Sequence, residues 1–319
     1  MIEVSEKLKN KLNEAPSASG IYKMIDSKGN IIYVGKSKQL NKRVKTYFAN
    51  NPKWDKVNRM VHLIDDIEYI VTDTHLEARL LECNLIKTIK PIFNSQMKHD
   101  KGYVYLRIED YNKNRALSVI NSREENSFGP YRRKFHLNEI VNSLKNLYPI
   151  IRINDSYSFK YNLIPVSMDV NTFNENKSSL EEILTEESKG AIFIKELESK
   201  MKYEASLCNF EMASLYKKIM DNINYIITSI NKYNELTKRK VLLTLPINDG
   251  YKLFYIINGK IVKKDKYSKL SKSIINKFCN TANSESEIYY DMNEKSLIDF
   301  RDIIYSETLS LPENMVTII

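Results

Sequence analysis

The sequence predicts an α+β protein made of several small modules. Two β-prone runs near the N-terminus surround a glycine-containing turn, and the segments after them show helical periodicity. A long helical pattern occupies residues 192–230, and strand-like runs return after residue 240. With 319 residues, the chain is long enough for two or three domains that each bury a core. We divide it into residues 1–100, 101–190, 191–235 and 240–319.

Residues 1–100 predict a short antiparallel sheet flanked by helices. Residues 20–26 and 30–35 form a hairpin, in which Gly29 supplies the positive φ of the turn. Apolar residues from Leu40 to Phe48 recur at helical spacing. A helix, a strand and a second helix are expected at residues 56–65, 67–72 and 76–89, the last ending before Pro91.

Residues 101–190 predict a mixed connector with a strand at 103–108, a loop at 128–131, a helix at 137–147 and then a polar stretch. In residues 191–235 an apolar seam steps by three and four, and a break at Cys208 predicts a helical hairpin. Residues 240–319 predict a small α/β module with strands at 241–245 and 251–257, a turn at 258–259 and later helices.

The composition excludes several classes of protein. No apolar run approaches the about 20 residues of a membrane-spanning helix, and the N-terminus lacks the apolar core of a secretory signal. We therefore expect a cytoplasmic, nucleoid-associated protein that does not bind membranes. The three cysteines lie far apart, which argues against a disulfide framework and against a cysteine-rich zinc or iron–sulfur site.

The net charge of +9 favours a polyanionic partner such as nucleic acid, and codon bias in a Lys- and Asn-rich genome is the alternative cause. The placement of the charge is more informative. Five cations fall within ten positions: Lys36, Lys38, Lys42, Arg43 and Lys45.

Glu82 lies on the apolar face of the helix predicted at 76–89. At about 100° per residue it falls within the arc occupied by Leu81, Leu85 and Ile86. An unpaired buried carboxylate costs free energy, so it requires a metal ion or an arginine. A structural ion pair is the commoner outcome, and Arg43 is the obvious partner. An inward Arg43 would equally suit a bidentate grip on a phosphodiester.

Tyr22 and Tyr33 lie one on each strand of the predicted hairpin, and Lys36 follows Tyr33 by three positions. A nearby ammonium group favours the phenolate, so we expect Lys36 to lower the pKa of Tyr33 toward the range of a general base. Packing in the sheet is the alternative role for both phenols.

The order of these residues resembles the GIY-YIG nuclease superfamily. The resemblance rests on Gly20-Ile21-Tyr22, Tyr33-Val34-Gly35-Lys36-Ser37-Lys38, Arg43, Glu82 and Pro91-Ile92-Phe93-Asn94. Two longer phrases, Leu80-Leu81-Glu82-Cys83-Asn84-Leu85-Ile86-Lys87 and Phe128-Gly129-Pro130-Tyr131, resemble the UvrC family of bacterial excision-repair incision subunits. Residues 197–213 are similar to the UVR motif, an antiparallel helix pair that in this family docks the damage-loading subunit UvrB.

The resemblance implies a metal-dependent endonuclease that hydrolyses one strand of damaged double-stranded DNA. A single Mg²⁺ or Mn²⁺ ion would bind Glu82 and the scissile phosphate. Tyr33, assisted by Lys36, would be the base, and Tyr22 would place the nucleophile or the phosphate, with the choice between the two phenols left open. The other catalytic positions would be Arg43, stabilising transition-state charge, and Asn94, orienting Glu82 or the hairpin.

The resemblance also implies two binding surfaces. DNA would be held without sequence readout, and with strong salt dependence, by Gly35, Lys38, Lys42, Lys45, Lys98 and Lys101. Gly35 would let the backbone pass close to the substrate. A UvrB-like protein would bind the helical hairpin through Leu197, Met201, Phe210, Ala213 and Tyr216.

The sequence departs from full-length UvrC in three ways that change the activity and cofactor we expect. The chain ends at Ile319 without a ribonuclease H-like domain or a helix-hairpin-helix clamp, so we expect one type of cut. Residues 150–190 contain no cysteine, so we expect no iron–sulfur cluster. Ser19 and Asn41 replace a common proline and a common basic residue. The short architecture is similar to Cho-like proteins, which incise on the 3′ side of a lesion after UvrB has opened the DNA.

A catalytically silent adaptor that binds DNA or UvrB is the alternative function, but every site position carries a chemically suitable residue. An invasion-type endonuclease of a mobile element would need a sequence-reading module, and neither a helix-turn-helix nor a zinc-finger signature is evident.

Overall fold

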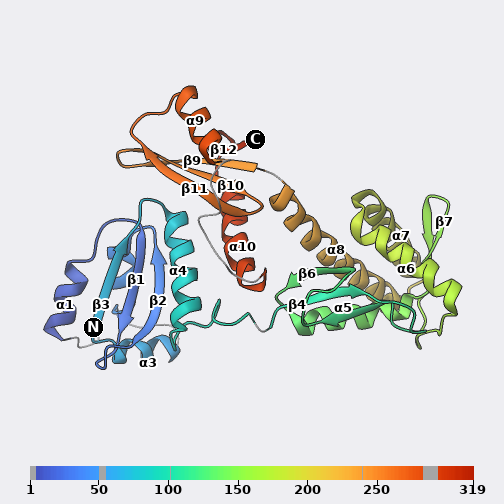
Figure 1. Cartoon of the computed structure of the whole chain (residues 1–319). Helices are drawn as coiled ribbons and strands as arrows, with labels where there is room; N and C mark the ends of the chain where they lie inside the picture. The colour runs from blue at the N-terminus through green and yellow to red at the C-terminus, as the bar shows by residue number, and fades with distance from the viewer. Residues whose placement is uncertain (1–4, 50–54, 101, 239, 283–293) are drawn as a thin grey trace. The chain divides into compact units, whose positions relative to one another are not determined.

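The computed structural model describes residues 5–49, 55–100, 102–238, 240–282 and 294–319. Its contacts divide the chain into two compact units, Met1–Asp100 with Leu236–Ile319, and Lys101–Glu235 (Figure 1). Both units contain helices and antiparallel strands, which confirms the mixed α and β content. In the described ranges no helix combines the length and the apolarity needed to span a membrane.

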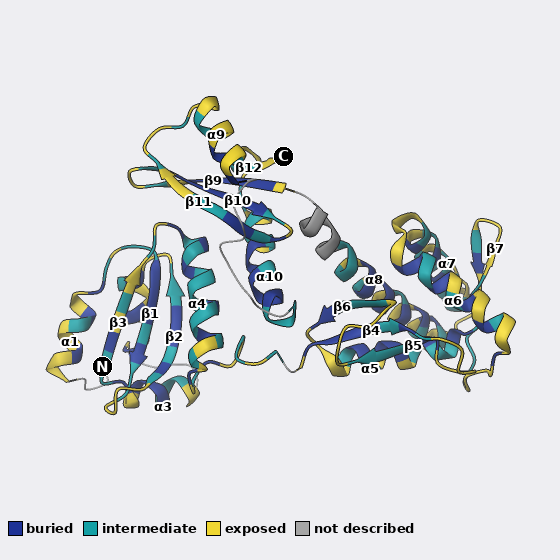
Figure 2. Ribbon diagram, in the orientation of Figure 1, coloured by how far each residue is buried: buried dark blue, intermediate teal, exposed yellow. Residues whose placement is uncertain are grey.

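The N-terminal part of the first unit is built on a three-stranded antiparallel sheet with the order β2-β1-β3. β1 (Gly20–Ile25) and β2 (Ile31–Ser37) form the predicted hairpin, and β3 (Asp66–Val71) pairs with the other edge of β1. Asp26 stabilises the turn, because its Oδ1 accepts hydrogen bonds from the backbone N–H groups of Lys28 and Asn30. The central strand β1 is buried along most of its length (Figure 2).

Four helices accompany this sheet: α1 (Glu6–Asn13), α2 (Leu40–Lys45), α3 (Asp55–Leu63) and α4 (His75–Ile89). α2 is shorter than predicted, because the chain turns after Lys45 and brings Tyr47 and Phe48 into the core from that turn. α4 begins after Thr74, whose side chain accepts from the N–H of Glu77. It ends at Ile89, and the next residue, Lys90, caps it in the left-handed conformation. It packs against β1 and β2.

The C-terminal part of the first unit is a four-stranded antiparallel sheet with the order β11-β10-β9-β12. Its elements are β9 (Lys240–Ile247), β10 (Gly250–Ile257), β11 (Lys260–Tyr267), α9 (Lys272–Ala282), α10 (Glu294–Ser310), a 3₁₀ turn (Glu313–Met315) and β12 (Val316–Ile318). Neither β11 nor β12 is among the predicted strands, since β11 is dominated by lysines. This part shares a hydrophobic core with α4 through Leu76 and Cys83, so α4 is packed by both parts of its unit.

The second unit begins with a three-stranded antiparallel sheet of β4 (Val104–Ile108), β5 (Leu117–Ile120) and β6 (Ser127–Tyr131) in the order β5-β4-β6. α5 (Lys134–Leu144), a 3₁₀ turn (Lys145–Leu147) and the hairpin of β7 (Ile151–Ile153) and β8 (Ser156–Ser158) follow. The prediction of a loop at residues 128–131 is wrong. These residues lie in β6, because their backbone pairs with β4 and Tyr131 is buried, although Gly and Pro are typical of turns.

Three helices complete this unit: α6 (Val170–Thr185), α7 (Glu187–Ser206) and α8 (Phe210–Lys238). α6 lies in the polar stretch for which no helix is predicted. It forms because Asp169 caps its first turn and one face of the helix buries Phe173, Leu180 and Ile183. The turn between α7 and α8 includes Cys208, which is left-handed (φ 59°) and lies at the predicted break.

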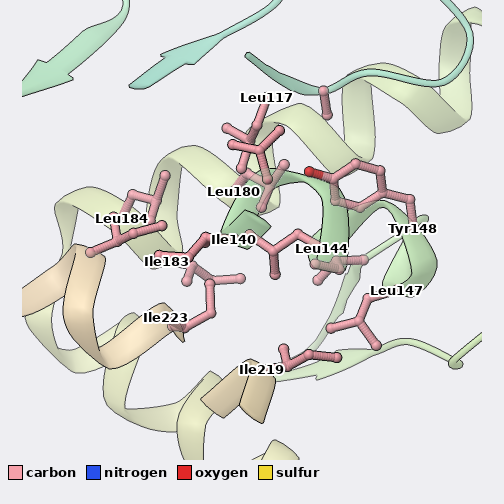
Figure 3. Close-up of a cluster of buried hydrophobic side chains, with 14 of the residues drawn as sticks. Leu117, Ile140, Leu144, Leu147, Tyr148, Leu180, Ile183, Leu184, Ile219 and Ile223 are labelled. Carbon is pink, nitrogen blue, oxygen red and sulfur yellow. The ribbon is translucent and has the colours of Figure 1, made fainter. Parts of the chain in front are cut away.

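One hydrophobic core holds the second unit together. Figure 3 shows Leu117 of β5, Ile140 and Leu144 of α5, Leu180 of α6 and Ile223 of α8 converging. The residues expected as a connector and those expected as a helical hairpin therefore fold around the same core.

Candidate active site

Three phenol groups meet beside the β1–β2 hairpin. Tyr22 comes from β1, Tyr33 from β2 and Tyr47 from the turn after α2. The hydroxyl oxygens of Tyr22 and Tyr47 are 2.7 Å apart, and Tyr47 donates to the Tyr33 oxygen at 3.4 Å. Tyr47 is absent from the predicted site because it looks like one more apolar position of the α2 stripe. Its spacing of four residues from Arg43 is the signal that could have found it.

Gly35 makes room for this phenol cluster. It pairs with Tyr22 across the β1–β2 ladder, and a Cβ atom at Gly35 would lie 2.3 Å from the Tyr22 hydroxyl oxygen. Gly35 is itself buried. The Tyr22 ring therefore occupies the space beside Gly35, and the close approach of the Gly35 backbone to DNA stays a prediction.

Arg43 is attached to the phenol cluster. Its Nη2 donates to the Tyr47 hydroxyl at 3.1 Å, and its Cζ lies 4.9 Å from the centre of the Tyr47 ring. The residue as a whole is exposed. Arg43 and Glu82 do not form the ion pair that was the commoner expectation for a buried carboxylate. The guanidinium thus carries its charge at an open surface next to three phenols.

Glu82 is half-buried on α4, and its Oε1 accepts a hydrogen bond of 3.1 Å from the backbone N–H of Lys36. Burial raises the pKa of Glu82, and the charges of Lys36, Arg79 and Arg43 act in the opposite direction. In the part of the chain that the structure describes, Glu82 forms no ion pair. One oxygen is therefore oriented by β2, and no cation among the described residues is paired with the carboxylate.

Lys36 acts on Glu82 rather than on Tyr33. The predicted lowering of the Tyr33 pKa is wrong: burial, Tyr47 and the Glu82 carboxylate raise it well above its ordinary value. Burial likewise raises the pKa of Tyr22. The physical reason is the pleat of β2, since residues three apart on a strand point to opposite faces. Both phenols are neutral at physiological pH.

Asn94 holds the middle of β2. It is buried, its Oδ1 accepts from the N–H of Val34 at 3.0 Å, and its Nδ2 donates to the carbonyl of Val34 at 2.8 Å. Of the two roles expected for Asn94, orienting Glu82 or orienting the hairpin, the contacts support the second. Val34 lies between Tyr33 and Gly35, so Asn94 sets the position of both site residues.

The predicted DNA-binding lysines lie at the surface of the first unit. Lys38, Lys42 and Lys45 are exposed. Lys98 is half-buried, with its Nζ 3.5 Å from the carbonyl oxygen of Ile92, and Lys101 lies outside the described residues. Their contact with DNA stays a prediction.

Two residues of α4 extend the site beyond the predicted set. His75 and Arg79 precede Glu82 by seven and three positions, which places all three on one side of the helix. Nδ1 of His75 is buried and has no hydrogen-bond partner among the described residues. Burial and the charges of Lys36 and Lys38 lower the pKa of His75 to about 4. The surroundings of Glu82 are therefore strongly cationic.

The residues of this site fit a hard divalent cation held by one carboxylate. The described residues contain no group of three or more His, Cys, Asp or Glu side chains that could hold a metal ion. Mg²⁺ does not need such a cage, because it keeps several waters and binds through one or two carboxylates together with substrate phosphates. Glu82 supplies the carboxylate and the cationic surroundings supply the attraction for phosphate.

The positions predicted to bind a partner protein have different environments. Leu197, Ala213 and Tyr216 are buried, and Leu197 and Tyr216 belong to the core of the second unit. Met201 is half-buried against the same core, whereas Phe210 is 68% exposed. A surface role for the three buried residues is therefore wrong, because the apolar seam of the helices packs within its own unit.

Comparisons with known proteins match the part of the chain that holds these residues. The family model described as "UvrC-like GIY-YIG domain" matches residues 18–95. The UvrABC system protein C of Alkaliphilus oremlandii is 31% identical over 283 residues, which cover 82% of this chain and 45% of that protein. Its counterpart in Desulfitobacterium hafniense is 29% identical over 323 residues, 98% of this chain and 50% of that protein. The chain thus spans about half the length of these curated relatives.

A solved structure with sequence similarity covers the N-terminal part. It is the GIY-YIG N-terminal endonuclease domain of UvrC from Thermotoga maritima, described as bound to its catalytic divalent cation, magnesium. It is 38% identical, covers 29% of this chain and 100% of its own, and has a TM-score of 0.27.

Proposed function

We propose, on the premise that residues 18–95 are a UvrC-like GIY-YIG domain, that this chain is a divalent-metal-dependent endodeoxyribonuclease. It makes a single-strand incision on the 3′ side of a lesion, in nucleotide excision repair that depends on UvrB. The observation that carries this proposal is the half-buried Glu82 carboxylate, which has no ion pair among the described residues and lies among phenols and cations.

Glu82 is the proposed ligand of a single Mg²⁺ or Mn²⁺ ion. When bound at Glu82, the ion would supply Lewis-acid polarisation of the phosphate and would stabilise charge on the leaving oxygen. The hydrogen bond from the Lys36 N–H orients the carboxylate before any ligand arrives. Asn94 in turn holds the strand that carries this N–H.

The phenol cluster orients the attacking water. Tyr33 and Tyr22 are protonated at neutral pH, so we assign them hydrogen-bonding roles instead of the predicted role of base. Tyr33 accepts a hydrogen bond from Tyr47, which leaves its own O–H to donate toward the substrate. The Glu82 charge acts on Tyr33, which supports a position for Tyr33 facing the metal ligand.

Arg43 stabilises the charge that develops on the phosphate. Its exposed guanidinium retains donors besides the Nη2 that is bonded to Tyr47. In the reaction the water oxygen bonds to phosphorus and the bond to the 3′ oxygen breaks. One water is consumed, and the products are a 3′-hydroxyl and a 5′-phosphate.

DNA is held along the exposed lysines of the first unit. Lys38 follows β2, and Lys42 and Lys45 lie on α2. None of the three has an acidic partner in the described part of the chain, and they contact phosphates rather than bases. Binding should therefore weaken with salt by a slope that grows with the number of phosphates contacted.

The turn between α7 and α8 is the proposed site for a UvrB-like protein. Tyr203, Leu207 and Phe210 are 63%, 56% and 68% exposed, and they surround this turn. Large apolar side chains at the surface of a turn are typical of a protein interface. This surface replaces the buried seam residues as the docking site.

A nicking assay tests the nuclease proposal. The full chain is incubated with lesion-bearing duplex and Mg²⁺ or Mn²⁺, with and without UvrB. We expect Glu82→Gln and Arg43→Ala to cut about 10²- to 10³-fold more slowly than the wild type. Glu68→Gln, which changes an exposed carboxylate of β3, is the matched control and should cut normally. Equal cutting by all four proteins would indicate a contaminating activity, and DNA binding by the wild type without cutting would favour the adaptor.

A further inference from the structure

Arg79 and Glu82 are neighbours on one side of α4. They lie three positions apart, and the Arg79 charge acts on the Glu82 carboxyl. An Arg three positions before a Glu on a helix is close enough to form an ion pair with it. Such a pair would occupy the carboxylate to which the proposed function assigns a metal ion.

Arg79 is engaged elsewhere. Its Nη1 donates to Oε2 of Glu307 at 2.7 Å, and its Nη2 donates to Oγ of Ser306 at 2.6 Å. Glu307 and Ser306 lie on α10. The side chains of Arg79 and Glu307 are only 20% and 13% exposed, so water screens their attraction less than on an open surface.

The position of Glu307 is set by the packing of α10 on α4. Leu76 and Cys83 of α4 share a hydrophobic core with Phe300 and Ile303 of α10. A second ion pair, of 2.7 Å between Lys87 and Asp299, joins the same two helices. The acceptor for Arg79 is therefore held in place by a well-packed interface rather than by a mobile surface side chain.

We propose that Glu307 is a positioning residue that holds Arg79 away from Glu82 and so keeps the Glu82 carboxylate free for a divalent cation. This inference rests on the proposed function, because it assumes that Glu82 binds the metal. Without Glu307, Arg79 turns toward Glu82, and the cation must displace a guanidinium. The C-terminal part of the first unit thereby sets the metal affinity of the N-terminal part.

The test measures Mn²⁺ binding to the full chain by calorimetry, together with Mn²⁺-dependent nicking. We expect Glu307→Ala to raise the Kd for Mn²⁺ about two- to fivefold, the range of a partly shielded ion pair. Nicking at saturating Mn²⁺ should be close to that of the wild type. Arg79→Met should bind Mn²⁺ at least as tightly as the wild type, and adding Arg79→Met to Glu307→Ala should restore tight binding.

A matched control separates positioning from stability. Asp299→Asn removes the partner of Lys87 from the same α4–α10 interface, and Lys87 is five positions from Glu82 on another side of the helix. We expect it to lower the Tm without changing the Kd for Mn²⁺. If Glu307→Ala does not fold, Glu307→Gln keeps the size of the side chain and should give the same shift at about twofold.

An unchanged Kd in a folded Glu307 variant would overturn the inference alone, as would a double variant that binds no better than Glu307→Ala. Failure of the wild type to bind Mn²⁺ and to nick DNA would overturn the proposed function and this inference with it.

Discussion

The phenol cluster of the first unit and the α7–α8 helices of the second unit relate differently to the sequence. Around β1 and β2, the predicted residues Tyr22, Tyr33 and Arg43 meet within one network that is joined by Tyr47. Along α7 and α8, Leu197 and Tyr216 belong instead to the core of their own unit. The predicted catalytic residues thus lie together in the first unit, whereas the predicted partner-binding residues of α7 and α8 do not form one surface.

The difference follows from the chemistry of the residues. A carboxylate or an arginine among apolar positions breaks the pattern, and burial of such a group is costly enough that it marks a special role. An apolar residue in an apolar seam can lie in a core or at a protein interface, and the sequence pattern is the same in both. Exposure separates the two, and it is the basis on which we propose Tyr203, Leu207 and Phe210 as the docking site in place of the buried seam.

Gly35→Ala is the strongest way to break the phenol cluster. The added methyl would lie 2.3 Å from the Tyr22 hydroxyl oxygen, so the ring or β2 must shift. We expect a loss of cutting of about 100-fold, since a displacement of about 1 Å has that effect, and a destabilisation of about 1–3 kcal/mol. Nicking rates and the Tm measure the two effects.

Gly29→Asn is the control, because Gly29 has a positive φ that asparagine tolerates and no atom near its added Cβ. Normal cutting by Gly35→Ala would show that the phenol geometry does not matter for activity.

Tyr47→Phe removes the hydroxyl that joins the phenol cluster and keeps the ring. Both other phenols and Arg43 lose a hydrogen-bond partner. We expect nicking to fall about 10- to 100-fold, the loss expected when buried partners are left unsatisfied in the site. Circular dichroism should report an intact fold.

Tyr69→Phe tests the same chemical change on β3, where the hydroxyl donates to the carbonyl of Lys11 outside the cluster. It should cut at the wild-type rate. Equal losses in both variants would mean that hydroxyls of this sheet act on stability alone.

The exposed and the buried apolar residues of α7 and α8 should respond differently to substitution. Phe210→Ser and Leu207→Ser should weaken association with UvrB about tenfold, because exposed apolar anchors dominate such interfaces, and should leave the Tm unchanged. Tyr216→Ala should lower the free energy of unfolding by about 2–4 kcal/mol, because Tyr216 is in the core. Binding can be measured by calorimetry with purified UvrB.

If the Ser variants lowered the Tm as much as Tyr216→Ala does, Leu207 and Phe210 would contribute to the core rather than to a free surface. Wild-type affinity of both Ser variants would remove the turn as the docking site.

The smallest expected effect is the contribution of His75 to the pH dependence of stability. Its pKa is about 4 in the folded chain and about 6.5 when unfolded, so below pH 6.5 the unfolded chain binds a proton that the folded chain does not. Stability should fall as the pH decreases from 6.5 toward 4, by about 1 kcal/mol between pH 7 and pH 5.5.

Hydrogen exchange of the α4 amides at these two pH values measures this change, and His75→Gln should reduce the pH dependence. An identical pH dependence in the variant would show that His75 is not its source.

Local sequence patterns predicted the secondary structure of segments whose own residues favour one conformation. The hairpin of β1 and β2 was predicted from Gly29 and β-prone runs, and α4 from apolar periodicity that ends before Pro91. β6 was not predicted, because its pairing with β4 outweighs its turn residues. α6 was not predicted, because burial of one face against the core outweighs its polar composition.

The chemical groups of the site and their order can be read from the amino-acid sequence, because Glu82, Arg43 and Asn94 are recognisable as polar residues in a family pattern. Which of these groups meet depends on how distant segments pack. Tyr47 joins Tyr22 across 25 positions, and Arg79 turns to Glu307 across 228 positions instead of to Glu82 nearby. Contacts of this kind depend on the packing of distant segments, which no local pattern encodes.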